Sequence, residues 1–281
     1  MREFHVLNLG AGVQSTMLYL MFMRGELKPQ IHFAIFGDTG DEPQAVYDHL
    51  GWMRNLQGPP ILCRSKPNRL SEDLMRGVNS TGQRFAAIPA FTTSDGSTVG
   101  RTKRQCSKEY KTEVIERSIR RDVVNLQPRQ RIPRGTIIHQ YFGISADEAG
   151  RAARIRERFK TKPWAQPHFP LLERFITRGD AIRYLTGKVP HETPRSACVY
   201  CPYHSDEEWR RVKAVPEDWA LAIQVDRALR EPGRVVNRDM KSAMYLHRSL
   251  KPLEEVILKP HPADRQLSIG FWQECEGVCG V

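Results

Sequence analysis

The sequence predicts an α/β fold: an open, mostly parallel sheet with helices on both faces, followed by a Pro-rich, mainly helical C-terminal region. Short apolar runs of strand length occur near residues 4–9, 31–36, 60–63 and 137–144. Segments with helical apolar spacing lie between them. Alternation of this kind is typical of parallel strands joined by right-handed crossovers.

The first elements follow directly from the residue pattern. Phe4–Leu9 is an apolar run that predicts a buried strand, and it ends in Gly10-Ala11-Gly12. The stretch from Gln14 to Arg24 then has the apolar spacing of a helix. Ile31–Phe36 predicts a second strand, which ends at Gly37-Asp38-Thr39-Gly40.

The next elements are shorter or less regular. Pro43 fits the start of a second helix, and residues 60–63 predict a third strand. Residues 64–105 are rich in Ser, Gly, Thr and Arg, so we expect a long irregular loop or lid. A helix at 109–124 and a strand at 137–144 continue the alternation.

The pattern changes after residue 160, where prolines recur. We therefore expect two regions: residues 1–160 as an α/β domain, and residues 161–281 as a cysteine-containing region packed on the sheet. Short helices are expected near 179–186, 206–213 and 217–230.

Composition limits the classes of function. No run approaches 18 apolar residues, so the sequence predicts no membrane span. The N-terminus lacks the pattern of a secretory signal, which favours a cytoplasmic protein. The net charge of +11 favours a polyanionic partner, such as a nucleotide or nucleic acid, although a solvated basic face is the simpler alternative.

The segment Gly10-Ala11-Gly12-Val13-Gln14-Ser15-Thr16 is a candidate phosphate loop. A strand, small residues and a helix in this order let backbone N–H groups surround an anion. The hydroxyls of Ser15 and Thr16 could add contacts to phosphate. The segment has no Walker-type lysine, and a tight strand-to-helix turn is the alternative reading. At the end of the second strand, Asp38 could meet a ribose or a metal, or could simply cap a turn.

Six cysteines provide the second signal. Cys198 and Cys201 form a C-x2-C pair, whose spacing lets two thiolates reach one metal ion or cluster. A local redox pair and a structural zinc knuckle are the alternatives. Because a reducing cytosol disfavours structural disulfides, the cysteines are better interpreted as ligands or catalytic thiols.

In family order, these motifs resemble the adenine nucleotide alpha-hydrolase group, and within it the phosphoadenylylsulfate (PAPS) reductase-like branch. The PP-loop motif would be Gly10–Thr16, followed by Asp38-Thr39-Gly40-Asp41. Later family motifs would be residues 104–111, with Arg104, Cys106 and Lys111, and residues 143–151, with Arg151. The match departs at several positions: Gly10 replaces Ser, Gln14 replaces the loop Asp, Ser145 replaces Arg and Ala149 replaces Ser.

The resemblance implies a PP-loop fold that binds ATP or another adenine nucleotide, with Mg²⁺ as a candidate companion. Its nucleotide-binding residues would be Gly10, Ala11, Gly12, Gln14, Ser15, Thr16, Asp38, Thr39, Gly40, Arg104, Lys111 and Arg151.

The cysteine spacing is also similar to that of iron–sulfur adenylylsulfate reductases and iron–sulfur thiolation enzymes. This likeness implies a 4Fe–4S cluster on Cys106, Cys198 and Cys201. Either Cys275 or Cys279 completes the ligand set, or the cluster keeps an open iron and Cys275 and Cys279 act as catalytic thiols. Zinc in place of the cluster, and no metal at all, remain alternatives.

The expected function is adenine nucleotide-dependent sulfur transfer, with tRNA or DNA as a candidate acceptor and a cysteine desulfurase or another sulfur donor. One alternative is an adenylylsulfate or PAPS reductase that forms sulfite. Another is a non-enzymatic nucleic-acid-binding protein with structural zinc.

Overall fold

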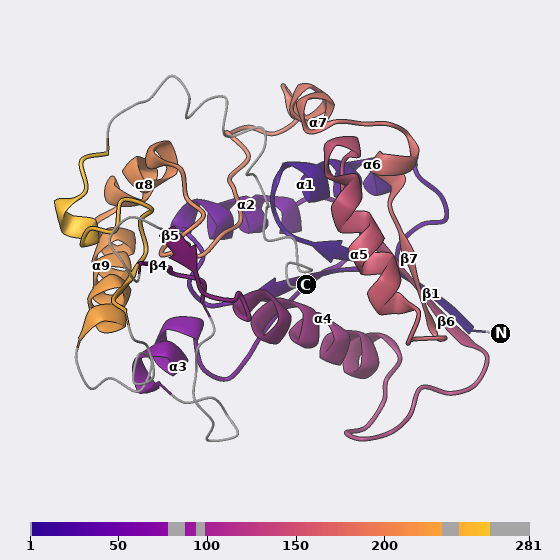
Figure 1. Cartoon of the computed structure of the whole chain (residues 1–281). Coiled ribbons are helices and arrows are strands. Elements are labelled where there is room, and N and C mark those ends of the chain that lie inside the picture. The colour runs from indigo at the N-terminus through magenta and orange to yellow at the C-terminus, as the bar shows by residue number, and fades with distance from the viewer. Residues whose placement is uncertain (1, 78–87, 94–98, 232–241, 259–281) are drawn as a thin grey trace.

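The computed structural model describes residues 2–77, 88–93, 99–231 and 242–258. Within these residues, five parallel strands form the central sheet in the order β3-β2-β1-β6-β7 (Figure 1). Helices flank this sheet, so the predicted open α/β fold is confirmed. The strands are β1 (Arg2–Leu9), β2 (Phe33–Asp38), β3 (Ile61–Ser65), β6 (Thr136–Phe142) and β7 (Ala165–His168).

The strand order reverses beside β1. From β1 the chain builds outward through β2 to β3, and it later returns to the other side of β1 to add β6 and then β7. Asn8 of β1 is in register with Ile35 of β2 and with Phe142 of β6. The switch point of the sheet therefore lies between the carboxyl ends of β1 and β6. β7 also carries the sheet past residue 160, where composition suggested a boundary.

Alternate residues of β1 face opposite layers of the protein, as strand geometry requires. Leu7 and Leu9 join one core with α1 (Val13–Met23), α2 (Gln44–Arg54) and α7 (Arg178–Leu185). Val6 faces the other side, where it packs with Ile115 and Ile119.

The helix on that other side has an irregular form. α4 (Glu113–Ser118) is flanked by π-helical turns at Lys108–Thr112 and Ile119–Val123, so the expected helix at 109–124 is present in three pieces. α5 (Ala149–Phe159) packs over β6 and β7 through Ala152, Ile155 and Phe159. A short helix, α6 (Pro170–Glu173), follows β7.

A second layer lies to one side of the sheet, where α8 and α9 gather near α3, β4 and β5 (Figure 1). Its core surrounds the fully buried Trp209. It contains α3 (Leu70–Arg76), α8 (Asp206–Lys213), α9 (Pro216–Arg230) and a small antiparallel sheet of β5 (Val99–Arg101), β4 (Phe91–Thr93) and β8 (Met244–Tyr245). β4 pairs with β5 near residue 100 and with β8 near residue 245, so this small sheet links segments that are distant in the sequence.

The expected irregular segment 64–105 thus contains a helix and two strands. Each has only three to seven residues, too few to display a clear period in the sequence. The three short C-terminal helices, α7, α8 and α9, lie where the sequence placed them. Among the described residues, no helix has the length and apolarity to cross a membrane.

Candidate functional site

The glycine loop occupies the switch point of the sheet. β1 ends at Leu9, and α1 begins at Val13 with Gly12 as its N-cap. The carboxyl ends of strands at a switch point are where open α/β sheets bind ligands. Ala11 has a φ of 59°, in the left-handed region that non-glycine residues seldom adopt. The loop is therefore sharply turned where it enters the helix.

The start of α1 offers backbone donors to an anion. Its first helical hydrogen bond runs from the N–H of Thr16 to the carbonyl of Gly12, at 2.9 Å. The N–H groups of residues 13–15 consequently have no acceptor inside the helix, as at any helix N-terminus. No acidic side chain lies in the first turn of α1 to oppose a bound anion.

Gln14 joins this loop to the loop that follows β6. Its amide nitrogen lies 3.3 Å from the Ser145 hydroxyl and 3.1 Å from a Glu148 carboxylate oxygen. Its amide oxygen accepts a hydrogen bond from Arg178 of α7, at 3.2 Å. Glu148 in turn pairs with the buried Arg151, at 2.7 Å. The candidate phosphate loop and the 143–151 motif are thus brought together across the switch point.

Ser15 and Thr16 are fully buried, and their hydroxyls bond within the protein. The Ser15 hydroxyl donates to the carbonyl of Gly12, at 3.2 Å. The Thr16 hydroxyl lies 2.9 Å from Nε2 of His49, and Nδ1 of His49 lies 2.8 Å from Nε2 of His191. Burial, with a smaller effect from His191, lowers the pKa of His49 to about 4. A neutral histidine on α2 therefore supports the first turn of α1 through Thr16.

Asp38 caps the turn at the carboxyl end of β2. One of its oxygens accepts from the N–H of Gly40, at 2.8 Å, and from the Tyr47 hydroxyl, at 3.0 Å. Burial raises the pKa of Tyr47, and Asp38 adds to the shift. Gly40 has a φ of 80°, and a Cβ there would approach Cγ of Arg69 to 2.8 Å. The turn therefore requires glycine at this position.

The two acidic residues after this turn are buried and fully engaged. The Asp41 carboxylate accepts from the N–H of Ser71, at 2.7 Å, and from the hydroxyl of Tyr200, at 2.6 Å. Glu42 accepts from Lys111, at 2.7 Å, and from the hydroxyl of Ser196, at 3.0 Å. Both carboxylates tie the end of β2 to the segment that carries the C-x2-C pair.

Lys111 lies in the buried ion pair with Glu42, with only 1% of its surface exposed. Its π-helical segment packs tightly against β2, because a Cβ on Gly37 would lie 3.0 Å from the Lys111 backbone. In this structure the ammonium stabilises the junction between the sheet and the cysteine segment. A role for Lys111 in offsetting phosphate charge stays a prediction.

Three predicted cysteine ligands meet at this junction. The Cys198 sulfur lies 3.2 Å from the Thr39 hydroxyl, and the N–H of Val199 donates to the carbonyl of Asp41, at 2.9 Å. Cys106 and Cys198 both pack against the core of the second layer. Burial raises the pKa of the Cys198 thiol well above its usual range, with Glu42 adding to the shift. Bound metal would replace the thiol proton at such a site.

The spacing of the sulfurs bears on which metal group fits. Within the described residues, one group of three His, Cys, Asp or Glu side chains has its ligand atoms all within 4.8 Å of one another, and it is Glu3, His5 and His139. The sulfurs of Cys106, Cys198 and Cys201 do not meet this limit as a group. Zn–S bonds of about 2.3 Å place tetrahedral thiolates only about 3.8 Å apart. A 4Fe–4S cluster carries its thiolates on separate irons and so spreads them farther. Which group the three cysteines bind stays a prediction.

Arg104 lies beside the cysteines, with its guanidinium 5.4 Å from the ring centre of Tyr203. Arg101 approaches the same ring, at 5.8 Å. Cys106 and Cys201 both add to the raised pKa of Tyr203, which burial chiefly causes. The 104–111 motif and the C-x2-C turn therefore share one region. Cys275 and Cys279 lie outside the described residues.

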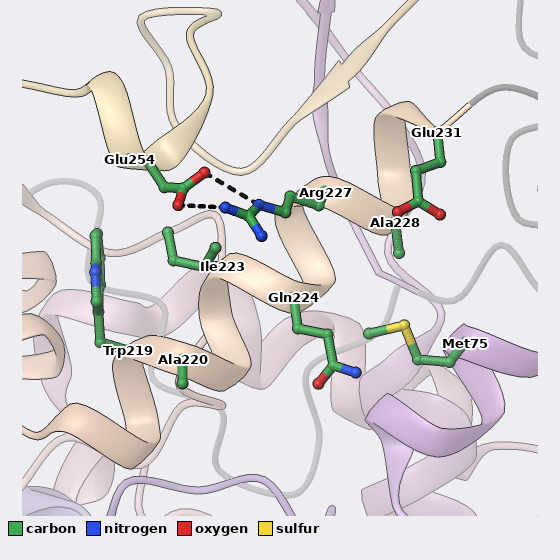
Figure 2. Close-up of a pocket in the computed structure, with 9 residues that line it drawn as sticks. All are labelled: Met75, Trp219, Ala220, Ile223, Gln224, Arg227, Ala228, Glu231 and Glu254. Atoms are coloured by element: carbon green, nitrogen blue, oxygen red, sulfur yellow. Dashed lines mark hydrogen bonds and ion pairs between the residues drawn. The ribbon is translucent and has the colours of Figure 1, made fainter.

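A separate pocket of about 600 Å³ lies over α9 (Figure 2). Arg227 spans one side of it and pairs with Glu254, at 2.6 Å. Trp219, Ile223 and Met75 add apolar side chains to its lining, and Gln224 and Glu231 add polar ones. None of its described lining residues belongs to the predicted nucleotide or cysteine site.

Several residues of this site were not assigned a role from the sequence. They are Asp41, Glu42, His49, Arg178, Ser196 and Tyr200. Asp41 ends the Asp38-Thr39-Gly40-Asp41 motif and Glu42 follows it, which is a signal that could have identified them. His49 lies at a core position of α2, where a lone histidine carries no signal of its partner.

Comparisons with protein-family models, curated proteins and solved structures found no match to this chain.

Proposed function

We propose that this protein is an adenine nucleotide-dependent sulfur-transfer enzyme whose cysteine site adjoins its nucleotide loop. The observation that carries the proposal is the contact of Thr39 with Cys198, which joins the end of β2 to the C-x2-C pair. The candidate phosphate loop follows the neighbouring strand β1. An activated acceptor and a sulfur-binding group would therefore lie at the same edge of the sheet.

The nucleotide would bind across the switch point. Backbone N–H groups of residues 10–15 would receive its phosphates. Arg178, which bonds to Gln14, and Arg151, which bonds to Glu148, would supply positive charge, although each already has a partner. Asp38, fixed by Gly40 and Tyr47, would contact the ribose or a Mg²⁺ ion.

Cys106, Cys198 and Cys201 would hold a 4Fe–4S cluster, which when bound supplies an iron that can take sulfur as a ligand. The Thr39 hydroxyl would hydrogen-bond to the Cys198 sulfur and tune its electron density. The tail thiols Cys275 and Cys279 remain candidates for a fourth ligand or a nucleophile.

The reaction would proceed in two displacements. An acceptor oxygen attacks the α-phosphorus of ATP, the bond to the β-phosphate oxygen breaks, and pyrophosphate leaves. Sulfur at the sulfide oxidation level then attacks the activated carbon, and AMP departs with the oxygen. No net oxidation occurs, so the scheme needs only a sulfide-level donor.

A nucleic-acid acceptor is favoured by positive charge on the described surface. A hollow of about 320 Å³ beside α4 is lined by Arg117, Arg120, Arg121 and Arg129 together with Glu113 and Glu116. Arg101 and Arg104 add charge near the cysteines. Guanidinium groups pair well with phosphate, which supports tRNA or DNA as acceptor.

The test is an anaerobic assay with ATP, sulfide and either unmodified tRNA or DNA. The proposal predicts pyrophosphate and AMP release that depends on the acceptor, with sulfur recovered in the nucleic acid. Cys198→Ala should abolish sulfur incorporation, whereas Cys63→Ala on β3 should retain it. Sulfite formation from a sulfonucleotide and thioredoxin would instead identify a reductase. Tight nucleic-acid binding without either reaction would indicate a binding protein.

A further inference from the structure

Histidines gather on one face of the sheet, away from the nucleotide loop. Four of the nine histidines lie in a row: His5 on β1, His139 on β6, His168 on β7 and His32 directly before β2. His5 and His139 are register partners on β1 and β6. Gly10 lies five residues beyond His5, or about 16 Å at the rise of a strand. The row is therefore separate from the switch point.

Glu3 completes a compact group with two of these histidines. Glu3 precedes His5 by two residues on β1, so both side chains face the same side of the sheet. One ligand atom from each of Glu3, His5 and His139 lies within 4.8 Å of the other two. A Glu3 carboxylate oxygen lies 3.7 Å from Nε2 of His139, too far for a hydrogen bond.

The ring nitrogens of the two histidines are divided between two roles. Nδ1 of His5 lies 3.0 Å from the hydroxyl of Tyr141, and Nδ1 of His139 lies 2.9 Å from Nε2 of His168. Nε2 of His139 is buried and has no hydrogen-bond partner within the described part of the chain. An unsatisfied buried nitrogen is costly, so its position beside a carboxylate requires an explanation.

We propose that Glu3, His5 and His139 bind a divalent transition-metal ion. Two imidazoles and one carboxylate form a ligand set that suits zinc, iron, cobalt or nickel. An ion about 2.0–2.2 Å from each ligand holds nitrogen and oxygen roughly 3–4 Å apart, as Glu3 and His139 are. Tyr141 and His168 would orient the rings through the opposite nitrogens, as outer partners do at metal sites.

The surroundings of His5 and His168 favour their neutral forms. Burial, together with the neighbouring His139 and His32, lowers the pKa of His5 to about 4, against the opposing effect of Glu3. Burial and His139 lower the pKa of His168, and Glu173 opposes this shift. The His5 and His139 rings are stacked, with centres 4.4 Å apart and planes 6° from parallel. Metal binding requires them to rotate about χ2, a broad torsion.

The test uses reduced, EDTA-treated full-length protein labelled with ¹⁵N in histidine. Zn²⁺ is added in steps at pH 7.5, and long-range ¹H–¹⁵N spectra follow each ring nitrogen. The cysteines bind the first zinc added, but each histidine has its own NMR signals, so binding at the histidines is observed separately. The proposal predicts that Nε2 of both His5 and His139 shifts on zinc binding, while His49 and His247 stay unchanged.

Glu3→Gln removes the carboxylate at an exposed position, so the variant should fold. It should weaken zinc binding at the two histidines at least tenfold. Glu157→Gln on α5, also at an exposed carboxylate, is the matched control and should bind as the wild type does. Unchanged His5 and His139 signals in a tenfold excess of zinc would overturn the proposal. Equal shifts in wild type and Glu3→Gln would overturn it as well.

Discussion

The side-chain hydroxyl of Thr39 lies 3.2 Å from the sulfur of Cys198, across 159 positions of sequence. Thr39 belongs to the turn after β2, and Cys198 opens the C-x2-C pair. Buried bonds from Asp41 and Glu42 hold the two segments together around this contact. The bonds of Asp41 and Glu42 therefore position this contact. A substitution at Thr39 can remove its hydroxyl and leave those bonds in place.

Thr39→Val tests the contact by removing a hydroxyl while keeping the shape of the side chain. Hydrogen bonds to ligand sulfur raise the reduction potential of an iron–sulfur cluster. We expect the variant to retain iron but to show a more negative potential in a spectroelectrochemical titration. Thr39→Ser keeps the hydroxyl and should resemble the wild type. Equal potentials in all three proteins would contradict a contact with the cluster.

Gln14→Ala tests the link across the switch point. The change removes hydrogen bonds to Ser145, Glu148 and Arg178, so both loops lose their mutual support. We expect ATP affinity to fall about tenfold in calorimetric titration and stability to fall by about 1 kcal/mol. Gln44→Ala removes an exposed amide at the start of α2 and serves as the control. Equal ATP affinity in both variants would refute a nucleotide site at this loop.

Lys111→Met tests the buried ion pair with Glu42. Removal of one partner leaves an uncompensated buried charge, which costs about 3–5 kcal/mol. Urea unfolding should show this loss. The double variant Lys111→Met, Glu42→Gln removes both charges and should recover part of it. A single variant as stable as the wild type would show that the pair contributes little.

His49 should make stability depend on pH. Its pKa in the folded protein is about 4, below the ordinary value of 6.5, so the unfolded chain binds the extra proton between these values. The contribution of His49 to the free energy of unfolding is fully present above about pH 6.5. It is lost as the pH falls towards 4, and the loss amounts to at most about 3 kcal/mol.

Urea midpoints at pH 7.5, 6.0 and 5.0 check this dependence. His5 also has a lowered pKa, so the stability of a variant without His49 should still depend on pH, but less than that of the wild type. His49→Gln should show a shallower loss of stability towards acid pH than the wild type. Identical pH profiles for the two proteins would contradict a buried, neutral His49.

Much of the fold could be predicted from the sequence because its strands and long helices have strong local patterns. The apolar run before Gly10 and the spacing within α9 are examples. The small sheet of β4, β5 and β8 could not be predicted, since its strands are two or three residues long and β8 pairs with β4 across about 150 positions. Their stability comes from the tertiary core around Trp209 rather than from local propensity.

The candidate site likewise has one part that the sequence could predict and one part that it could not. The motifs themselves could be recognised, but their connections could not. Nothing local to Gln14 indicates Arg178, and nothing local to Glu42 indicates Lys111 or Ser196. These buried polar partners are selected by the packing of distant segments. The sequence therefore predicted the residue types of the site better than the bonds that position them.

The central claim is that Cys106, Cys198 and Cys201 hold a metal–sulfur group beside the nucleotide loop. The most direct measurement is the iron, sulfide and zinc content of anaerobically purified wild type, Cys106→Ala and Cys63→Ala. We predict about four irons and four sulfides per chain in the wild type and in Cys63→Ala, with most of both lost in Cys106→Ala. About one zinc per chain without iron, or an unchanged iron content in Cys106→Ala, would contradict the claim.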